Sequence, residues 1–251
     1  MDGQIVRSAR VNSYSAGKRT IGGRYTKSYN SDYQASYVYE KSEEKQKQRE
    51  KVLDFILTNA KSRIKYLGFP GKDWMLERQL WAEDNTSRIT GVEKNPSIYE
   101  KAKGYVPGRV ALRDKSVSDG MKITYASSKQ CLYFLGELKH FLDSHIRNKL
   151  LTSGAYRYGF SFRNAVWLDF TSPLCQPVWE VLVGLNRVLT PYDASICVTL
   201  LYGRDTLLET PGEEGRVQVI ERAIPGFEAK KVWQYSGMNK SRMLTICGIR
   251  A

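Results

Sequence analysis

Residues 64–73, with the sequence IKYLGFPGKD, decide the fold that the sequence predicts. Residues 64–67 form a short strand-like run, and the chain breaks directly after it at residues 68–71, which hold two glycines and a proline. Asp73 then stands where its side chain can cap a helix that continues to about residue 84. A strand, a glycine turn and a helix in direct succession are typical of an α/β protein.

The segments on either side of this stretch continue the alternation. Residues 42–61 have the apolar spacing of a helix, and residues 89–92 form a second strand that ends on Glu93. A further helix begins at residues 95–96, Asn-Pro. The order helix, strand, helix, strand, helix predicts parallel strands joined by right-handed crossovers.

The last third of the chain adds four more strands and a helix. Residues 165–168 are typical of a buried strand, residues 178–189 of an amphipathic helix, and residues 195–202 of a second buried strand. Residues 231–235 and 243–249 are two strands with so short a connection that they must form an antiparallel hairpin. The predicted fold class is therefore α/β, a doubly wound, mostly parallel sheet with helices on both faces and an antiparallel C-terminal hairpin.

Residues 104–163 are less regular and basic. They contain candidate strands at residues 110–112 and 121–125, followed by a strong helix that Ser127 or Ser128 would cap. The apolar stripe of this helix consists of Cys131, Leu135, Leu138, Leu142 and Ile146. Residues 1–40 are rich in Gly, Ser and Tyr and have no apolar period, so we expect a flexible basic arm ahead of one domain at residues 41–251.

The predicted strand ends indicate where a ligand binds. In a doubly wound sheet, ligands bind outside the carboxyl ends of the strands, near the point where the strand order reverses. Residues 68–72, 93–95 and 169–173 would converge there. Gly68 and Glu93 lie 25 residues apart, and an acid at this distance from a glycine turn is placed to accept two ribose hydroxyls. The sequence therefore predicts a nucleoside-binding cleft.

Four segments resemble, in this order, the motifs of class I S-adenosylmethionine-dependent methyltransferases: IKYLGFPGKD, ITGVEKNP, NAVWLDF and VWQYSGMNKSRMLTICGI. The resemblance covers about residues 43–251. It implies a seven-stranded sheet of order 3-2-1-4-5-7-6 and S-adenosylmethionine as the cofactor. The sequence departs from the usual first motif, because Tyr66 stands near the place of its acid and Pro70 where a glycine is common.

The resemblance also implies roles for single residues. The cofactor-binding candidates are Gly68, Phe69, Pro70 and Gly71 of the first motif, Glu93, Lys94 and Asn95 at the ribose, and Asp169 and Phe170 after the fourth strand. Asp169 is also the catalytic candidate, because it would lie near the transferred methyl group. Each role has a structural alternative: the glycines could make only a turn, Glu93 could act on a helix dipole, and Asp169 could cap a loop.

Lysine and arginine outnumber aspartate and glutamate by 39 to 26, which gives a formal net charge of +13. The excess is +5 over residues 1–62, +8 over residues 63–163 and 0 over residues 164–251. This distribution favours a polyanion bound on one face, although basic residues that only solvate a surface would give the same charge. We therefore expect nucleic acid as the partner, bound by Arg19, Arg24, Arg147, Lys149, Arg157 and Arg163.

The function predicted is S-adenosylmethionine-dependent methyl transfer to DNA or RNA. Residues 169–173, DFTSP, lack the contiguous D/N-P-P-Y/F pattern of exocyclic-amine DNA methyltransferases, and Cys175 does not follow the proline that cytosine C5 enzymes require. The alternative is a catalytically degenerate protein that keeps the fold and binds nucleic acid or serves assembly, because the first motif is atypical. A nicotinamide-dependent oxidoreductase is disfavoured, since no clear G-x-G-x-x-G is present.

Cysteine usage and hydropathy limit the remaining possibilities. The cysteines, Cys131, Cys175, Cys197 and Cys247, are far apart, and with two histidines they match neither a zinc site nor a secreted disulfide framework. We therefore expect no metal and a reducing, cytoplasmic compartment. No apolar run reaches the length of a transmembrane helix, and the N-terminal residues lack the apolar region of a secretion signal, so no membrane association is expected.

Overall fold

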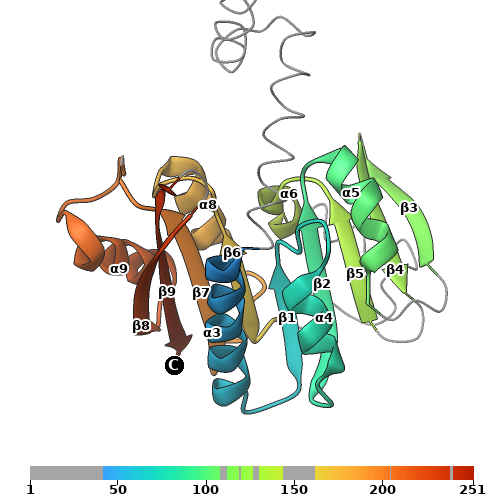
Figure 1. Cartoon of the computed structure of the whole chain (residues 1–251), viewed down its shortest axis with the longest axis horizontal. Coiled ribbons are helices and arrows are strands. Elements are labelled where there is room, and N and C mark those ends of the chain that lie inside the picture. Colours follow the sequence, from blue (N-terminus) through green and yellow to red (C-terminus); the bar gives the residue numbers. More distant parts are fainter. Residues whose placement is uncertain are drawn as a thin grey trace, which may run out of the picture.

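A computed structural model describes residues 42–107, 112–118, 120–126, 130–143, 162–203, 205–237 and 240–251. Its strands are β1 (Ile64–Gly68), β2 (Thr86–Glu93), β3 (Leu112–Ser118), β4 (Met121–Ala126), β5 (Gln130–Leu135), β6 (Ala165–Asp169), β7 (Ala194–Leu201), β8 (Phe227–Ser236) and β9 (Arg242–Arg250). Its helices are α3 (Glu43–Asn59), α4 (Met75–Ala82), α5 (Pro96–Ala102), the 3-10 turn η2 (Lys103–Tyr105), α6 (Leu138–Leu142), α8 (Gln176–Leu185) and α9 (Gly212–Ala223). Figure 1 shows these elements as one twisted sheet with helices packed against it.

The strands of the described residues form a single sheet of order β3-β4-β5-β2-β1-β6-β7-β9-β8. The five strands from β5 to β7 are parallel to one another, whereas β9 is antiparallel to both β7 and β8. Counted from β5, this is the expected order 3-2-1-4-5-7-6, which confirms the doubly wound fold with its C-terminal hairpin. Two further antiparallel strands, β3 and β4, extend the sheet beyond β5, so it has nine strands rather than seven.

The predicted helix with a stripe from Cys131 to Ile146 is wrong in its first half. Residues 130–135 form β5, and in the described residues up to 143 the short helix α6 follows it. The strand β5 is buried on both faces: Tyr133 belongs to the core on one side of the sheet and Phe134 to the core on the other. A run that is apolar at every position shows no strand alternation, so its spacing also fits a helix. Ile146 lies outside the described residues.

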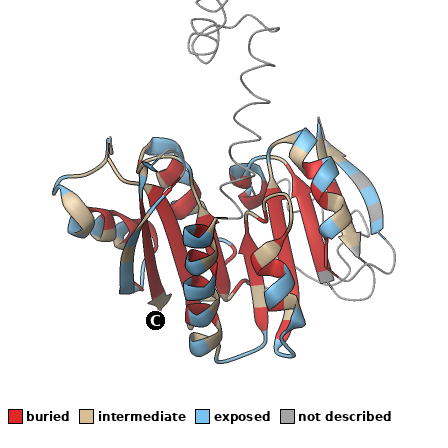
Figure 2. Ribbon diagram, viewed as in Figure 1, coloured by how far each residue is buried: buried red, intermediate tan, exposed pale blue. Residues whose placement is uncertain are grey.

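Helices cover both faces of the sheet. One core cluster joins the strands to α3, α4 and α5, and the other joins them to α6, α8 and α9. Figure 2 shows the central strands as the buried layer, and the outer sides of the helices and much of the edge strands β3 and β8 as less buried or exposed. The sequence did not predict α9. Within the described part of the chain, no helix is long and apolar enough to cross a membrane.

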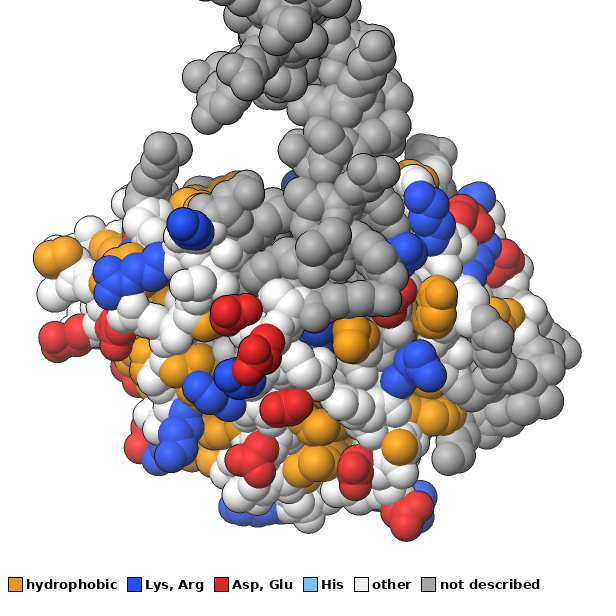
Figure 3. Space-filling model, in the orientation of Figure 1, with side chains coloured by type: hydrophobic (Ala, Val, Ile, Leu, Met, Phe, Trp, Pro, Cys, Tyr) orange, Lys and Arg blue, Asp and Glu red, His pale blue; other side chains and the backbone are white. Residues whose placement is uncertain are grey.

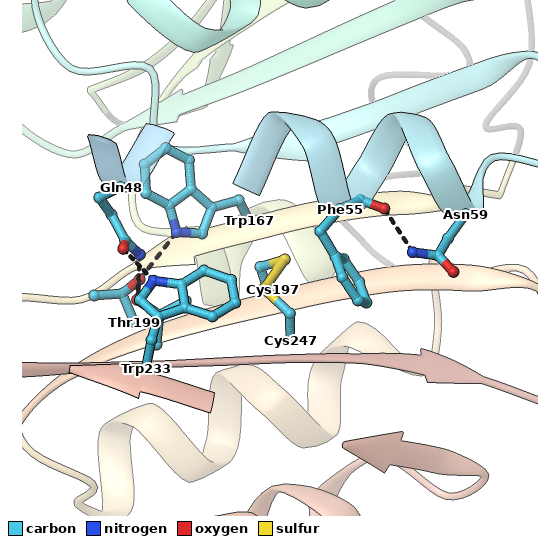
Figure 4. Close-up of a disulfide and its surroundings, with 9 residues drawn as sticks. Gln48, Phe55, Asn59, Trp167, Cys197, Thr199, Trp233 and Cys247 are labelled. Atoms are coloured by element: carbon cyan, nitrogen blue, oxygen red, sulfur yellow. Dashed lines mark hydrogen bonds between the residues drawn. A yellow bond between two sulfur atoms is a disulfide. The ribbon is translucent and has the colours of Figure 1, made fainter. Parts of the chain in front are cut away.

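Cys197 on β7 and Cys247 on β9 form a disulfide, although they lie 50 residues apart in the sequence. The antiparallel register places them directly opposite each other, with their Cα atoms 4.1 Å apart. They lie under α3, beside Phe55 (Figure 4). The sequence did not predict this pair, although two cysteines, Cys131 and Cys175, remain free. The cysteine spacing does not reveal it because only the strand register brings the two residues together.

Candidate active site at the carboxyl ends of the strands

A cavity of about 220 Å³ lies at the carboxyl ends of β1, β2 and β6. Five of the residues that the sequence analysis selected line it: Phe69, Pro70 and Gly71 after β1, Glu93 at the end of β2, and Asp169 at the end of β6. Strand ends that are far apart in the sequence therefore meet at one place, as the doubly wound topology requires. The volume is below the range of about 300 to 1,000 Å³ that is usual for small-molecule sites.

The turn after β1 uses its two glycines differently. Gly71 has a φ of 58°, in the left-handed region where other residues are strained, and a Cβ atom there would meet nothing within 4 Å. Gly68, by contrast, has no room for a side chain: a Cβ atom would lie 2.8 Å from the carbonyl oxygen of Trp167 on β6. Gly68 therefore allows β1 and β6 to pack, while Gly71 belongs to the wall of the cavity.

Phe69 and Phe170 follow β1 and β6, and their rings meet edge to face. The ring centroids are 5.5 Å apart and the planes are inclined by 73°. Phe69 lines the cavity, whereas Phe170 packs against the Phe69 ring and is not among the lining residues. The pair therefore joins the two strand ends that flank the cavity.

Glu93 is a half-buried carboxylate at the end of β2. Its Oε1 accepts a hydrogen bond from the backbone N–H of Asn95 at 2.7 Å. Burial raises the pKa of the Glu93 carboxyl above its usual value of 4.5, although this bond acts in the opposite direction. The side chain of Asn95 caps α5 by accepting from the backbone N–H groups of Ser97 and Ile98. Asn95 thus shapes the turn, and neither Asn95 nor Lys94 lines the cavity.

Asp169 forms an ion pair with Lys45, which lies in the first turns of α3. Lys45 is only 2% exposed, and its ammonium lies 5.3 Å from the ring centroid of Trp167 and 5.8 Å from that of Tyr235. The sequence analysis did not select Lys45. A signal was present, because Lys45 and Arg49 lie seven and three residues before the buried Val52 and therefore on the same helical face. Both residues line the cavity.

The sequence also did not indicate a carboxylate that comes from α4. Glu77 is 2% exposed and lines the cavity, and its Oε1 accepts a hydrogen bond from the hydroxyl of Tyr66 at 3.2 Å. Tyr66 lies in β1 and is fully buried. Burial, followed by the negative charge of Glu77, raises the pKa of the Tyr66 hydroxyl well above 10. The hydroxyl therefore stays protonated and donates a hydrogen bond to the Glu77 carboxylate.

The structure corrects one of the expected nucleic-acid contacts. Arg163 is 1% exposed, and its Nη2 donates to Oγ1 of Thr90 at 2.8 Å, so its guanidinium is an interior group rather than a surface contact for phosphate. The other expected contacts, Arg19, Arg24, Arg147, Lys149 and Arg157, lie outside the described residues. In Figure 3 the basic and acidic side chains of the described residues are interspersed on the face shown.

The arrangement was compared with known proteins. The sequence matches no protein-family model, and no curated protein sequence matches it either. The N-methyltransferase NodS from Bradyrhizobium japonicum WM9 has a similar structure, with a TM-score of 0.52, 9% sequence identity and coverage of 84% of this chain and 98% of that chain. An O-methyltransferase from Bacillus cereus, solved in complex with SAH, has a TM-score of 0.51 and 12% identity, with coverage of 81% and 80%. At this level of identity the likeness concerns the fold.

Proposed function

Because the chain has the fold of class I S-adenosylmethionine-dependent methyltransferases, we propose that it is such an enzyme and that its cofactor binds in the cavity at the strand ends. The observation that carries the proposal is the meeting of Gly71, Glu93 and Asp169 around one cavity, since the same three positions carry the resemblance in the sequence. The Bacillus cereus neighbour was solved with S-adenosylhomocysteine, the product form of this cofactor, which supports the choice of ligand.

The residues at the β1 and β2 ends suit the nucleoside part of the cofactor. The Glu93 carboxylate would accept hydrogen bonds from the two ribose hydroxyls. Met75 and Ile98 line the same cavity and would provide apolar surface for the base. Three further candidates would hold the turns in place: Gly68 by its close approach to Trp167, Asn95 by its cap on α5, and Phe170 by its ring contact with Phe69. Lys94 lies in the same turn as Asn95.

The residues at the carboxyl end of β6 suit the part of the site where the methyl group would be transferred. The bound cofactor supplies an activated methyl group on a sulfonium. Asp169 would orient an N–H or O–H of the acceptor, and Lys45 would hold the Asp169 carboxylate in position, since the two are ion-paired. Positioning of this kind and a fixed electrostatic environment are what an in-line transfer needs most from the protein.

Titration of the full-length protein with S-adenosylhomocysteine tests the proposal. We expect binding to the wild type and about tenfold or greater weakening in Glu93→Gln, because hydrogen bonds to a charged group contribute about 1.5 to 3 kcal/mol. Glu180→Gln is the matched control, since Glu180 is exposed on α8, and it should bind like the wild type. A wild-type protein that does not bind S-adenosylhomocysteine would rule out the enzyme.

Nucleic acid is the substrate class that we propose for this enzyme, in a cytoplasmic setting. The support is the net charge of +13 and its confinement to residues 1–163. A single-stranded oligonucleotide should bind with an affinity that falls with salt, and replacing Arg19 and Arg24 together by glutamine should lower the magnitude of the slope of log affinity against log salt by about 1.4 units. An unchanged slope would show that these two arginines make no phosphate contact.

A further inference from the structure

Residues 164–251 carry no net charge, but their charges are not all paired. Three of their cations form ion pairs with acids: Arg216 with Asp205, Arg222 with Glu209, and Lys230 with Glu228. Lys240 and Arg242, at the turn between β8 and β9, form an ion pair with no residue that the structure describes. Both side chains are exposed. A net charge of zero therefore conceals two uncompensated cations at one turn.

The guanidinium of Arg242 is held in place by the neighbouring side chains. Its central carbon lies 4.0 Å from the ring centroid of Tyr202, which follows β7, and its Nε donates a hydrogen bond to the side-chain oxygen of Gln234 on β8. Gln234 donates in turn to Glu213 on α9. A guanidinium has five N–H donors, and the four on the terminal nitrogens of Arg242 donate to none of the described residues. A planar fork of this kind matches the oxygens of a phosphate.

A second guanidinium lies against the same ring but is not accessible to a ligand. The central carbon of Arg216 is 3.9 Å from the centroid of the Tyr202 ring. Arg216 is 2% exposed, and it forms its ion pair with Asp205 and donates to the backbone oxygen of Gly212 at 2.5 Å. The charge of Arg216 is thus compensated within the protein. The guanidinium at Tyr202 that faces solvent is that of Arg242.

The turn lies at the same edge of the sheet as the cavity. Asp169 at the end of β6 pairs with Thr199 on β7, and Thr199 pairs with Thr245 on β9. Neighbouring strands are about 4.8 Å apart, so Thr245 lies about 10 Å across the sheet from Asp169. Arg242 precedes Thr245 by three residues, which places it about another 10 Å along β9, beyond the end of β7. An acceptor that reaches Asp169 from this edge of the sheet therefore passes close to Arg242.

We propose that Arg242 and Lys240 bind phosphates of the nucleic-acid acceptor beside the cavity, with Tyr202 and Gln234 holding Arg242 in position. The proposal rests on the proposed function, because it assigns a place to the proposed substrate. The site comes from the part of the chain that has no net charge, so the charge distribution along the sequence does not indicate it. Two cations at the edge of the cavity would hold the strand, while Asp169 orients the group to be methylated.

The salt dependence of binding of a single-stranded oligonucleotide to the full-length protein tests the proposal. Replacing Lys240 and Arg242 together by glutamine should lower the magnitude of the slope of log affinity against log salt by about 1.4 units, since each phosphate contact contributes about 0.7. The affinities of this variant and the wild type should then differ roughly 25-fold at 0.1 M salt and converge near 1 M.

The matched control is the Arg222→Gln and Lys230→Gln double variant, which also loses two positive charges. Both residues are partly exposed and ion-paired, so this variant should keep the wild-type slope. An equal fall in both double variants would show that only net charge matters and would overturn the proposal, as would an unchanged slope in the Lys240 and Arg242 variant.

Two further probes separate this proposal from the others. The affinity for S-adenosylhomocysteine should stay within about twofold of wild type in both double variants, because none of the four residues lines the cavity. A wild type that binds the oligonucleotide but not S-adenosylhomocysteine would contradict the enzyme and leave the phosphate site intact. Poly-glutamate should bind with a slope that the Lys240 and Arg242 variant does not change. An equal fall for poly-glutamate would indicate an acidic protein as the partner and would overturn the proposal.

Discussion

The helices α3 and α8 cover opposite faces of the same sheet and bury different kinds of side chain. The buried residues of α8 are Val178, Val181, Leu182 and Leu185. The buried residues of α3 are Lys45, Gln48 and Arg49, followed by Val52, Phe55 and Ile56. Apolar contacts alone hold α8 against the sheet. The polar groups under the first half of α3 must instead be hydrogen-bonded or ion-paired, because an unpaired polar group costs free energy when it is buried. The difference teaches that one face mainly stabilises the fold while the other also builds the cavity.

The polar groups under α3 form a chain of hydrogen bonds, part of which appears in Figure 4. The amide of Gln48 donates to Thr245 and accepts from the indole N–H of Trp233. Thr245 and Thr199 are hydrogen-bonded at 2.8 Å, and the indole N–H of Trp167 donates to Thr199 at 3.0 Å. Because Trp167 lines the cavity, this chain connects the cavity wall to the C-terminal hairpin.

The largest expected effect comes from the cross-link on the α3 face. Reduction of the Cys197–Cys247 disulfide should lower the free energy of unfolding by about 4 kcal/mol, since it releases a loop of about 50 residues in the unfolded chain. Urea unfolding with and without reductant measures this. A Cys197→Ala and Cys247→Ala double variant is the control and should not respond to reductant. If the wild type does not respond either, the α3 face does not depend on its cross-link.

The next effect tests the α8 face. Leu182 is fully buried, and Leu182→Ala should cost about 3 kcal/mol because it leaves a cavity among aliphatic side chains. The affinity for S-adenosylhomocysteine should stay within about twofold at temperatures where the variant is folded. Val183→Ala is the matched control, since Val183 is 41% exposed and should change stability by less than about 0.5 kcal/mol. A loss of ligand affinity in Leu182→Ala would show that the two faces are not independent.

The smallest expected effect concerns Glu93 and depends on pH. The pKa of its carboxyl is raised in the folded state, so the charged form is disfavoured there, and the group costs stability increasingly as the pH rises from about 4.5, where it ionises in the unfolded chain, through the raised pKa of the folded state. Glu93→Gln should therefore be slightly more stable than wild type at neutral pH, and this advantage should vanish below about pH 4.5, where both states of the wild type are protonated. Thermal unfolding across this pH range measures it. An advantage that persists in acid would assign the effect to packing rather than to charge.

The sequence was sufficient for the parallel strands β1, β2 and β6 and for their carboxyl ends, because a glycine turn or an acid stands at the end of each of them. It was not sufficient for β5, since a strand buried on both faces has no alternation, nor for the Cys197–Cys247 pair, which depends on register. Lys45 and Glu77 were missed for another reason. Charged residues in the first turns of helices are usually solvated, and only the packing of α3 and α4 over the strand ends buries these two.

The place where α3 begins has a consequence for how a substrate reaches the cavity. Residues 1–41 join the fold at Ser42, which caps α3 and stands three residues before Lys45 in the cavity wall. A molecule bound by those residues would therefore be tethered near the cavity. Its local concentration at the cavity would be set by the length of chain between its binding site and Ser42 rather than by its concentration in solution. Even weak binding of the proposed acceptor by the N-terminal residues would then increase how often that acceptor meets Asp169.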